Sequence, residues 1–446
     1  MVHHKAHALL TFVLLGSIVS TVAAQNQDLG RLLAPCVGEQ TLAVAQIDVT
    51  SVNVDALGQM AIETAAGTMK AEQVSQVKEI VADLAQTWKP RIAQFRSAGG
   101  ETLFVVLSTE EVLLAVPVTA RLDEAAMKAW FGAAWNGKPT TVVRKDGLLV
   151  AAPTWTMERW QARSPSPRSE LAQAASKATS AAISVFVIPS ADSRRVLEAM
   201  LPSALGEGVQ IQDNALVKGL QWATVNLGLP PAPSLNLYVE SADTVSAAAL
   251  REFLATTLKL ASQVPPLKQA YPNLEVPVAM LTPRVEGSSL QLALDEQQSR
   301  RLAAHFLTPG LFELRASLLR YACGTTLSGM GKAMLIYAND YDDKWPPSLE
   351  TLVEKAEYPR SGLICPAMKH QPDYASYVFR GVDTVGTSAE PSIIMVHDRA
   401  GNHRGGRNVL FVDSHVEWIT EEDFQKLIAH DNALRRKRGL PEKPAE

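Results

Sequence analysis

Between residues 41 and 153 the chain alternates strand-like apolar runs with stretches of helical periodicity. Apolar residues recur every three or four positions in residues 54–95 and 123–135, which predicts amphipathic helices, and the first should be interrupted near Pro90 because proline lacks a backbone N–H. Asp146-Gly147 suits a two-residue hairpin turn, because both residues tolerate positive φ. The runs that predict strands are residues 41–49, 102–108, 111–119, 140–145 and 148–153.

A similar order of elements recurs after a polar, proline-containing segment at residues 163–169. Helical periodicity is found at residues 192–201 and 244–260. The strand-like runs are residues 181–189, 220–228, 234–240, 278–287 and 289–295. The repetition predicts two α+β units that arose by a diverged duplication, residues 25–162 and 181–307, with residues 163–180 as a linker. Short turns between the strands favour antiparallel sheets with helices on one face over a doubly wound parallel sheet.

A third unit is predicted at residues 308–420. Thr308 is suited to an N-cap and Pro309 to the first helical position, and the apolar period that follows predicts a long helix to about Ala338. Residues 408–412 and 415–419 read as a hairpin with Asp413-Ser414 at its tip. Serine lacks the easy access of glycine to positive φ, so the turn is expected to be type I or wider rather than type I′.

Residues 421–446 are expected to form a final exposed helix and a basic tail. Acidic residues at 421–423 begin this helix and basic residues at 435–438 end it, as the helix dipole favours.

Length and composition indicate an ordinary globular protein. The 446 residues suggest roughly three domains of about 150 residues each. With 47% hydrophobic residues, 20% charged residues and a net charge of −4, the chain gives no indication of a nucleic-acid partner.

Residues 1–24 have the pattern of a secretory signal peptide. Lys5 precedes an apolar run from Ala8 to Val19, and small residues end at Ala24, which predicts cleavage there and a periplasmic or secreted protein. The alternative is an uncleaved anchor, although this run is shorter than the roughly 18–20 residues that span a bilayer. No other stretch is long enough, so no transmembrane segment is expected after signal removal.

The chain has three cysteines, Cys36, Cys323 and Cys365. Export to an oxidising compartment favours disulfide formation, and Cys323 and Cys365 are the preferred pair because both lie in the C-terminal third. The alternative is that all three are small buried thiols.

Two groups of polar residues in the C-terminal third are candidate ligand sets. Imidazole and carboxylate groups suit zinc, and with an open coordination position they would support hydrolysis; the alternative is that His403 is a structural residue that hydrogen-bonds the hairpin. Three acidic residues near residue 340 suit calcium, and the alternative is a solvated helix end. The zinc candidates are His397, Asp398, His403, Asp413 and His415, and the calcium candidates are Asp340, Asp342 and Asp343.

Residues 312–420 resemble the pseudopilin-like domain of the H-X9-DG family, which is abundant in planctomycetes and similar to type II secretion pseudopilins. Matching positions upstream of the final hairpin are Cys323, Leu327, Gly331, Ala333, Tyr337, Asp340, Pro346, Pro347, Cys365, Pro366, Tyr374 and Tyr377. The family motif itself covers His403, Gly405, Gly406, Asn408, Asp413, Ser414 and His415. Ser414 departs from the family, which usually has glycine at that position.

The resemblance implies a long helix with a small antiparallel sheet, and partners among envelope or secretion-system proteins. The resulting hypothesis is an exported, non-enzymatic protein that binds or scaffolds others and needs no cofactor. Two alternatives stay open at this point. One is a hydrolase that uses zinc at the C-terminal histidines and aspartates, and the other is a solute-binding protein with a ligand between the duplicated units.

Overall fold

A computed structural model describes residues 29–109, 111–135, 139–163, 166, 168–205, 215–261, 275–369, 371, 375–381 and 391–445. The predicted signal peptide and Tyr374 lie outside these residues. The chain divides into two compact units, residues 1–311 and residues 312–446, and the division falls inside helix α13 (Glu296–Asp340). Helices combine with antiparallel sheets in both, so the α+β class predicted from the sequence is confirmed.

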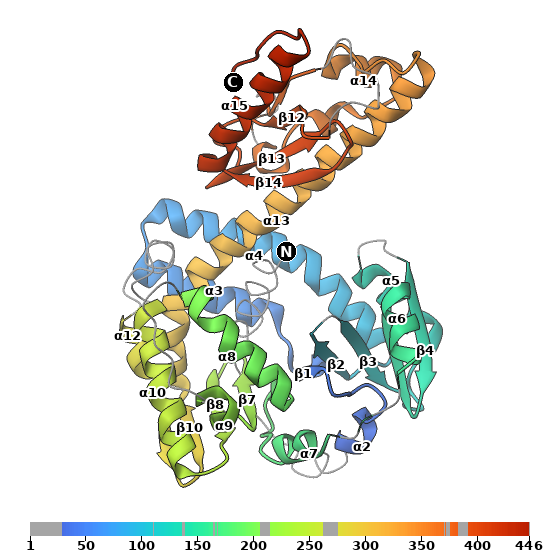
Figure 1. Cartoon of the computed structure of the whole chain (residues 1–446). Coiled ribbons are helices and arrows are strands. Elements are labelled where there is room, and N and C mark those ends of the chain that lie inside the picture. The colour runs from blue at the N-terminus through green and yellow to red at the C-terminus, as the bar shows by residue number, and fades with distance from the viewer. Residues whose placement is uncertain are drawn as a thin grey trace. The chain divides into compact units, whose positions relative to one another are not determined.

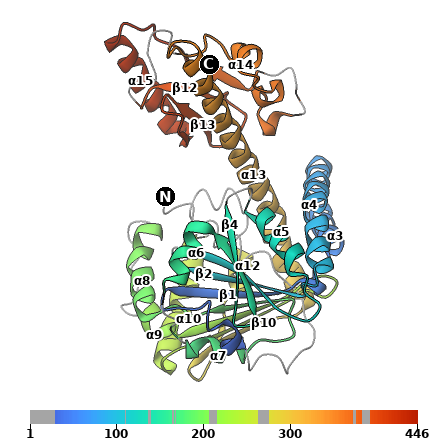
Figure 2. The ribbon, with the colours of Figure 1, turned by 90° about the vertical axis from the view of Figure 1, so that its right-hand side faces the viewer.

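The first unit is built on a ten-stranded antiparallel sheet (Figures 1 and 2). Its strands are β1 (Thr41–Asp48), β2 (Thr102–Ser108), β3 (Val112–Pro117), β4 (Thr140–Lys145), β5 (Leu148–Pro153), β6 (Ile183–Val187), β7 (Trp222–Gly228), β8 (Ser234–Glu240), β9 (Arg284–Glu286) and β10 (Ser289–Leu294). Their order is β4-β5-β3-β2-β1-β6-β7-β8-β10-β9.

The central pair β1 and β6 joins the two predicted α+β units into this one sheet. Outward from the pair, the order is β1-β2-β3-β5-β4 on one side and β6-β7-β8-β10-β9 on the other. The two halves therefore have the same strand order.

Helices cover both faces of the first half of the sheet. On β5, Leu148 and Val150 pack in one apolar cluster with α6 and α7, whereas Leu149 and Ala151 pack in another with α4 and α5. All six residues of β5 are buried. The expectation of helices on one face is wrong here. The helices of this half are α2 (Leu29–Leu33), α3 (Val54–Thr68), α4 (Ala71–Ser97), α5 (Glu124–Ala134), α6 (Thr154–Gln161) and α7 (Ser169–Ala175).

The segment predicted as a linker contains α7, which belongs to the core. Leu171, Ala174 and Ala175 are buried, and the Ala174 carbonyl accepts a hydrogen bond of 2.7 Å from the Thr224 hydroxyl on β7. Apolar residues at spacings of three and four place one face of this short helix on the sheet.

Three helical segments differ from the predictions. Helix α4 runs through Pro90, which is exposed, and the break falls instead at Met69–Lys70 between α3 and α4. Helix α13 begins at Glu296 rather than at Thr308. The remaining helices of this unit are α8 (Ala191–Leu205), α9 (Ala215–Gly219), α10 (Thr244–Ala261) and α12 (Glu275–Met280), the last lying where a strand was predicted.

The turn between β4 and β5 confirms the hairpin prediction. Asp146 has φ of 49° and Gly147 has φ of 83°, the positive values that a two-residue turn of type I′ requires at both central positions.

The second unit places two helices on opposite faces of a four-stranded antiparallel sheet (Figure 1). On β13, Leu410 packs with α13, whereas Val409 and Phe411 pack with Phe424 of α15, because successive strand residues point to opposite faces. The elements after α13 are α14 (Leu349–Lys355), η3 (Arg360–Leu363), η4 (Pro366–Met368), β11 (Tyr377–Phe379), β12 (Ile394–Asp398), β13 (Gly406–Phe411), β14 (Val416–Thr420) and α15 (Glu421–Lys437).

Helix α15 is an integral part of this unit rather than an exposed tail. Its acidic first turn and basic last turn are as predicted, and the Thr420 hydroxyl caps it by accepting the Asp423 N–H. Arg435 is buried, however, and is ion-paired to Asp431. Among the described helices, none is both long enough and apolar enough to cross a membrane.

The turn between β13 and β14 is not type I′. Of its two tip residues only Ser414 has positive φ, at 69°, and its N–H donates a 2.9 Å hydrogen bond to the Phe411 carbonyl. The serine therefore holds a left-handed conformation that glycine would adopt without a Cβ penalty.

We expect Ser414→Gly to stabilise the second unit by about 0.5–1 kcal/mol, because it removes that penalty. Native-state hydrogen exchange of the β13 and β14 amides measures the change. Ser361→Gly, at an exposed position without positive φ, is the matched control and should not stabilise. Equal or lower protection in the Ser414 variant would contradict the expectation.

Candidate functional site

Four chemically reactive side chains meet inside the second unit. Cys323 comes from the middle of α13, Cys365 directly precedes η4, Asp398 ends β12, and His403 lies in the loop between β12 and β13. One sulfur, nitrogen or oxygen atom from each lies within 4.8 Å of all the others. We call these four residues the interior cluster.

The interior cluster is closely spaced and closed to solvent. The Cys323 sulfur lies 3.0 Å from Asp398 Oδ1, the Cys365 sulfur lies 3.3 Å from His403 Nε2, and that nitrogen lies 3.5 Å from Asp398 Oδ2. Both cysteines and the aspartate are fully buried, and the His403 side chain is 4% exposed.

Strand alternation decides which residues reach the interior cluster. Asp398 points to the face of the small sheet that α13 covers, and its neighbour His397 points to the α15 face, where its ring centroid lies 4.8 Å from that of Phe424. Cys323 belongs to the apolar stripe of α13 that packs on the sheet, together with Leu327. Sheet and helix thus bring residues 75 positions apart into contact.

Asp398 is held by a set of hydrogen bonds to its carboxylate. Oδ2 accepts the Asn408 N–H at 2.8 Å and the Asn408 side-chain amide at 3.0 Å. Oδ1 accepts the Cys323 thiol at 3.0 Å and the Asn402 amide at 3.3 Å. These bonds fix the orientation of a buried carboxylate that would otherwise be costly.

The four groups perturb one another's protonation. The pKa of Cys365 is lowered to about 6, mainly by its hydrogen bond with Cys323, and the pKa of Cys323 is raised by the same bond and by burial. Burial alone would lower the pKa of His403, but its hydrogen bond to Cys365 and the nearby Asp398 raise it. A thiolate at Cys365 beside an imidazole is therefore the favoured charge state.

Glycine is required at two family-motif positions near the interior cluster. Gly405 has φ of 84°, and a Cβ on Gly406 would lie 2.2 Å from the Ile419 carbonyl oxygen. The pair lets the chain leave the His403 loop and enter β13 directly beside β14.

The five residues predicted as zinc ligands do not form one site. Asp398 and His403 join the interior cluster, whereas His397 lies on the other face of the sheet. Asp413 and His415 pair with each other at the exposed tip of the β13–β14 hairpin. There the Asp413 carboxylate accepts one hydrogen bond from the backbone N–H of His415 and another from its ring nitrogen Nδ1.

The structural alternative for His403 also needs correction. Its ring edge faces Trp418 of β14, with the ring centroids 5.9 Å apart, but the hydrogen bond of its Nε2 goes to Cys365 rather than to the hairpin backbone.

The acidic residues predicted for calcium lie at the exposed end of α13. Asp340 accepts a hydrogen bond from Asn339, and Asp342 lies 3.7 Å from the Lys344 ammonium. Within the described residues, these two and Asp343 do not assemble into a ligand group, and the interior cluster is the one group of at least three candidate ligands.

The cysteines predicted to pair do lie side by side. Cys323 and Cys365 are hydrogen-bonded to each other and are free thiols in this structure. Cys36 is also a buried free thiol, in the first unit, where burial raises its pKa to about 12.

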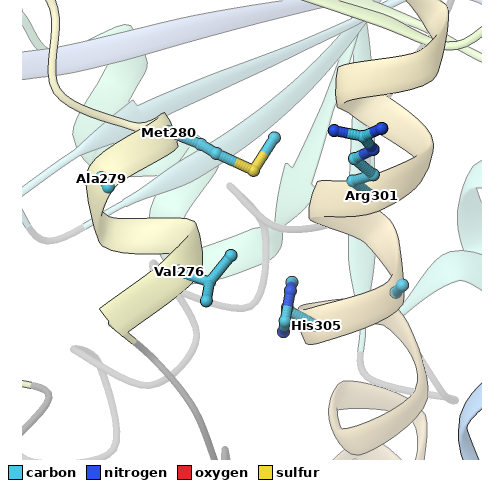
Figure 3. Close-up of a pocket in the computed structure, with 6 residues that line it drawn as sticks. Val276, Ala279, Met280, Arg301 and His305 are labelled. Carbon is cyan, nitrogen blue, oxygen red and sulfur yellow. The ribbon is translucent and has the colours of Figure 1, made fainter.

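A pocket that could hold a solute lies within the second half of the first unit (Figure 3). It has a volume of about 610 Å³ and lies between α12 and the first turns of α13 rather than between the two halves of the sheet. Val276, Met280, Arg301 and His305 are among its lining residues, and the pocket is open to solvent.

Chemically, the interior cluster is the best-defined site in the described part of the chain. Two thiols, an imidazole and a carboxylate are ligands that borderline metal ions accept. No protein-family model, curated protein or solved structure is significantly similar to this chain.

Proposed function

We propose that this chain is an exported, non-enzymatic protein that binds or scaffolds other proteins in cell-envelope or secretion-related assembly. Its C-terminal unit is then a pseudopilin-like docking module. Two features support the proposal: the signal-like pattern of residues 1–24, and the long helix α13 on a small antiparallel sheet, the arrangement that the H-X9-DG resemblance implies.

The observation that carries the docking role is an exposed apolar stripe on α13. Leu318, Tyr321 and Ile336 are 52%, 66% and 59% exposed. At 3.6 residues per turn they lie on one face, and Cys323, Leu327, Met330 and Met334 on the opposite face pack in the core. Large apolar side chains that a helix leaves in water favour burial against a partner.

The partner that fits this stripe is an amphipathic helix of an envelope or secretion-system protein. Leu318 and Tyr321 are one turn apart, and Ile336 lies roughly five turns beyond Leu318 on the same face. Side-chain ridges on a helix face of this kind pack into the grooves of a second helix. A negatively charged substitution within the stripe should prevent this packing, because the charge would be buried without a partner of opposite charge.

The test is site-specific photo-crosslinking from position 325, in the centre of the stripe, within the cells that make the protein. We expect one reproducible crosslinked envelope protein, and at least a tenfold lower yield in the Ile336→Glu variant. Val245→Glu is the matched control, because Val245 is an exposed aliphatic residue on α10 of the first unit. Equal yields in both variants, or no reproducible crosslink, would overturn the proposal.

A further inference from the structure

We propose that Cys323, Cys365, Asp398 and His403 bind one zinc ion, as a structural metal centre of the C-terminal unit. This site is independent of the docking function, because its four residues lie on the core side of α13 and the docking stripe lies on the other side.

The spacing of the interior cluster matches a tetrahedral zinc site. Zinc binds sulfur at about 2.3 Å and nitrogen or oxygen at about 2.0 Å, which places neighbouring ligand atoms about 3.3–3.8 Å apart. The Cys323 sulfur lies 3.0 Å from Asp398 Oδ1 and the Cys365 sulfur lies 3.3 Å from His403 Nε2. One ligand atom from each of the four residues lies within 4.8 Å of the other three. Binding of the ion would draw the more widely spaced ligand atoms, which are at most 4.8 Å apart, closer together.

The ligand types select zinc among the common divalent ions. Two sulfur ligands exclude calcium and magnesium, which take oxygen ligands, and a mixed sulfur and nitrogen set with four ligands is typical of zinc. Two thiolates and one carboxylate carry three negative charges, and a divalent cation is what makes their joint burial favourable.

The centre is structural rather than catalytic. Four protein ligands fill a tetrahedral shell, whereas a catalytic zinc keeps an open position for water or substrate. All four side chains are buried, so a substrate has no path to the ion.

The hydrogen bonds around Asp398 are those of an outer shell that orients a metal ligand. Asn408 holds Oδ2 through its backbone and side-chain nitrogens, which leaves Oδ1 facing Cys323. The Asn408 amide also donates to the Arg320 carbonyl on α13 at 3.2 Å, so this residue ties β13 to the helix at the site.

The ion would fasten a segment that has little regular structure. Between α14 and β12 the described residues form only the short turns η3 and η4 and the three-residue strand β11. Cys365 lies in this segment, and its bond to zinc would attach it to α13 through Cys323 and to the sheet through Asp398. We therefore expect the metal to stabilise the described residues between 356 and 381 more than any other part of the unit.

The test begins with elemental analysis of the full mature chain, purified without a metal-affinity tag from cells supplied with zinc. We expect one zinc per chain, and reaction of Cys323 and Cys365 with a thiol reagent only after a chelator has removed the metal. Replacement by cobalt should give the absorption of tetrahedral cobalt with a sulfur-to-cobalt charge-transfer band, which reports thiolate ligation directly.

Single substitutions identify the ligands. Loss of an outer-shell partner typically weakens metal binding by roughly 10- to 100-fold, and we expect the zinc affinity of Asn408→Ala to fall by a factor in this range. His403→Gln and Cys365→Ser remove ligands and should weaken zinc binding by more than this. The matched controls are His415→Gln and Cys36→Ser, which should retain one zinc per chain. If Cys365→Ser does not fold, His403→Gln and the cobalt spectrum still decide the question.

Three results would overturn the proposal. One is substoichiometric zinc in the native protein that reduction and added zinc do not raise. The second is equal zinc content in the ligand variants and their controls. The third is a Cys323–Cys365 disulfide in the purified protein whose reduction creates no zinc site.

Discussion

Replacement of Asp431 by alanine is expected to destabilise the C-terminal unit by about 3–5 kcal/mol, because it leaves two buried guanidinium groups without their counter-charge. Asp431 Oδ2 accepts hydrogen bonds from Arg380 Nε and Nη2 at 3.0 and 2.7 Å and from Arg435 Nε at 2.9 Å. Its Oδ1 accepts the Ile394 N–H of β12 at 3.0 Å. The three charged side chains are at most 1% exposed.

The loss should be measured as the change in unfolding free energy from urea denaturation of the full chain. Asp423→Ala is the matched control on the same helix, because Asp423 is exposed and water screens its ion pair with Lys426, so its loss should be far smaller. A loss of similar size in both variants would contradict the expected role of the buried Asp431 carboxylate.

A second comparison separates the charge from the packing. Replacement of Arg380, Asp431 and Arg435 together by methionine and leucine should recover much of the loss, because no unpaired charge then remains buried. A triple variant as unstable as Asp431→Ala would indicate that the hydrogen bonds to backbone carbonyls, such as that from Arg435 to Gly381, matter more than the charge.

Local patterns in the sequence predict most of the strands and hairpins correctly. The runs at 102–108 and 234–240 coincide with β2 and β8, and Asp146-Gly147 forms the expected turn. Each of these features is encoded by residues that are neighbours in the sequence. An alternation of period two, or a turn dipeptide, lies entirely within one short segment. The α+β class follows from them.

The start of α13 carries a local signal that the apolar period alone does not reveal. Asp295 accepts the Gln298 N–H at 2.8 Å, and the Gln298 side chain accepts the Asp295 N–H at 3.1 Å. Such a reciprocal capping box begins a helix at residue 296, which makes a second start at Thr308 unnecessary.

The joining of β1 to β6 could not be predicted from local patterns. Both strands carry apolar residues on two faces, because Val44 and Phe186 pack in one cluster whereas Ile47 of β1 and Val187 of β6 pack in others. Such a run does not specify its neighbour in a sheet. The pairing depends on contacts between residues more than 130 positions apart, for which a single sequence has no signal.

The sequence alone assigns the residues of the interior cluster to two separate hypotheses, a disulfide and a zinc site. The reason is again that contacts between distant residues leave no local signal. All four residues are candidates, but the cysteines suggest a disulfide, and Asp398 and His403 group with histidines close to them in sequence. Strand alternation then separates His397 from Asp398, a distinction that requires knowledge of which residue of β12 faces α13.

Replacement of Asp398 by alanine is the second change with a large expected effect. The carboxylate accepts the Asn408 N–H and the Cys323 thiol, and both donors lie in the closed interior between α13 and the sheet. An unsatisfied buried donor costs about 1–3 kcal/mol, so the variant should lose about 3–5 kcal/mol even when a chelator removes all metal.

The measurement is urea unfolding in the presence of the chelator, with Asp413→Ala as the control. Asp413 also accepts a backbone N–H, that of His415, but it is exposed, so water can replace it and the loss should stay below about 1 kcal/mol. A loss below about 1 kcal/mol for Asp398→Ala would mean that Asn408 and Cys323 find other acceptors. Asp398 would then matter to this unit through a bound metal alone, because its hydrogen bonds would be replaceable.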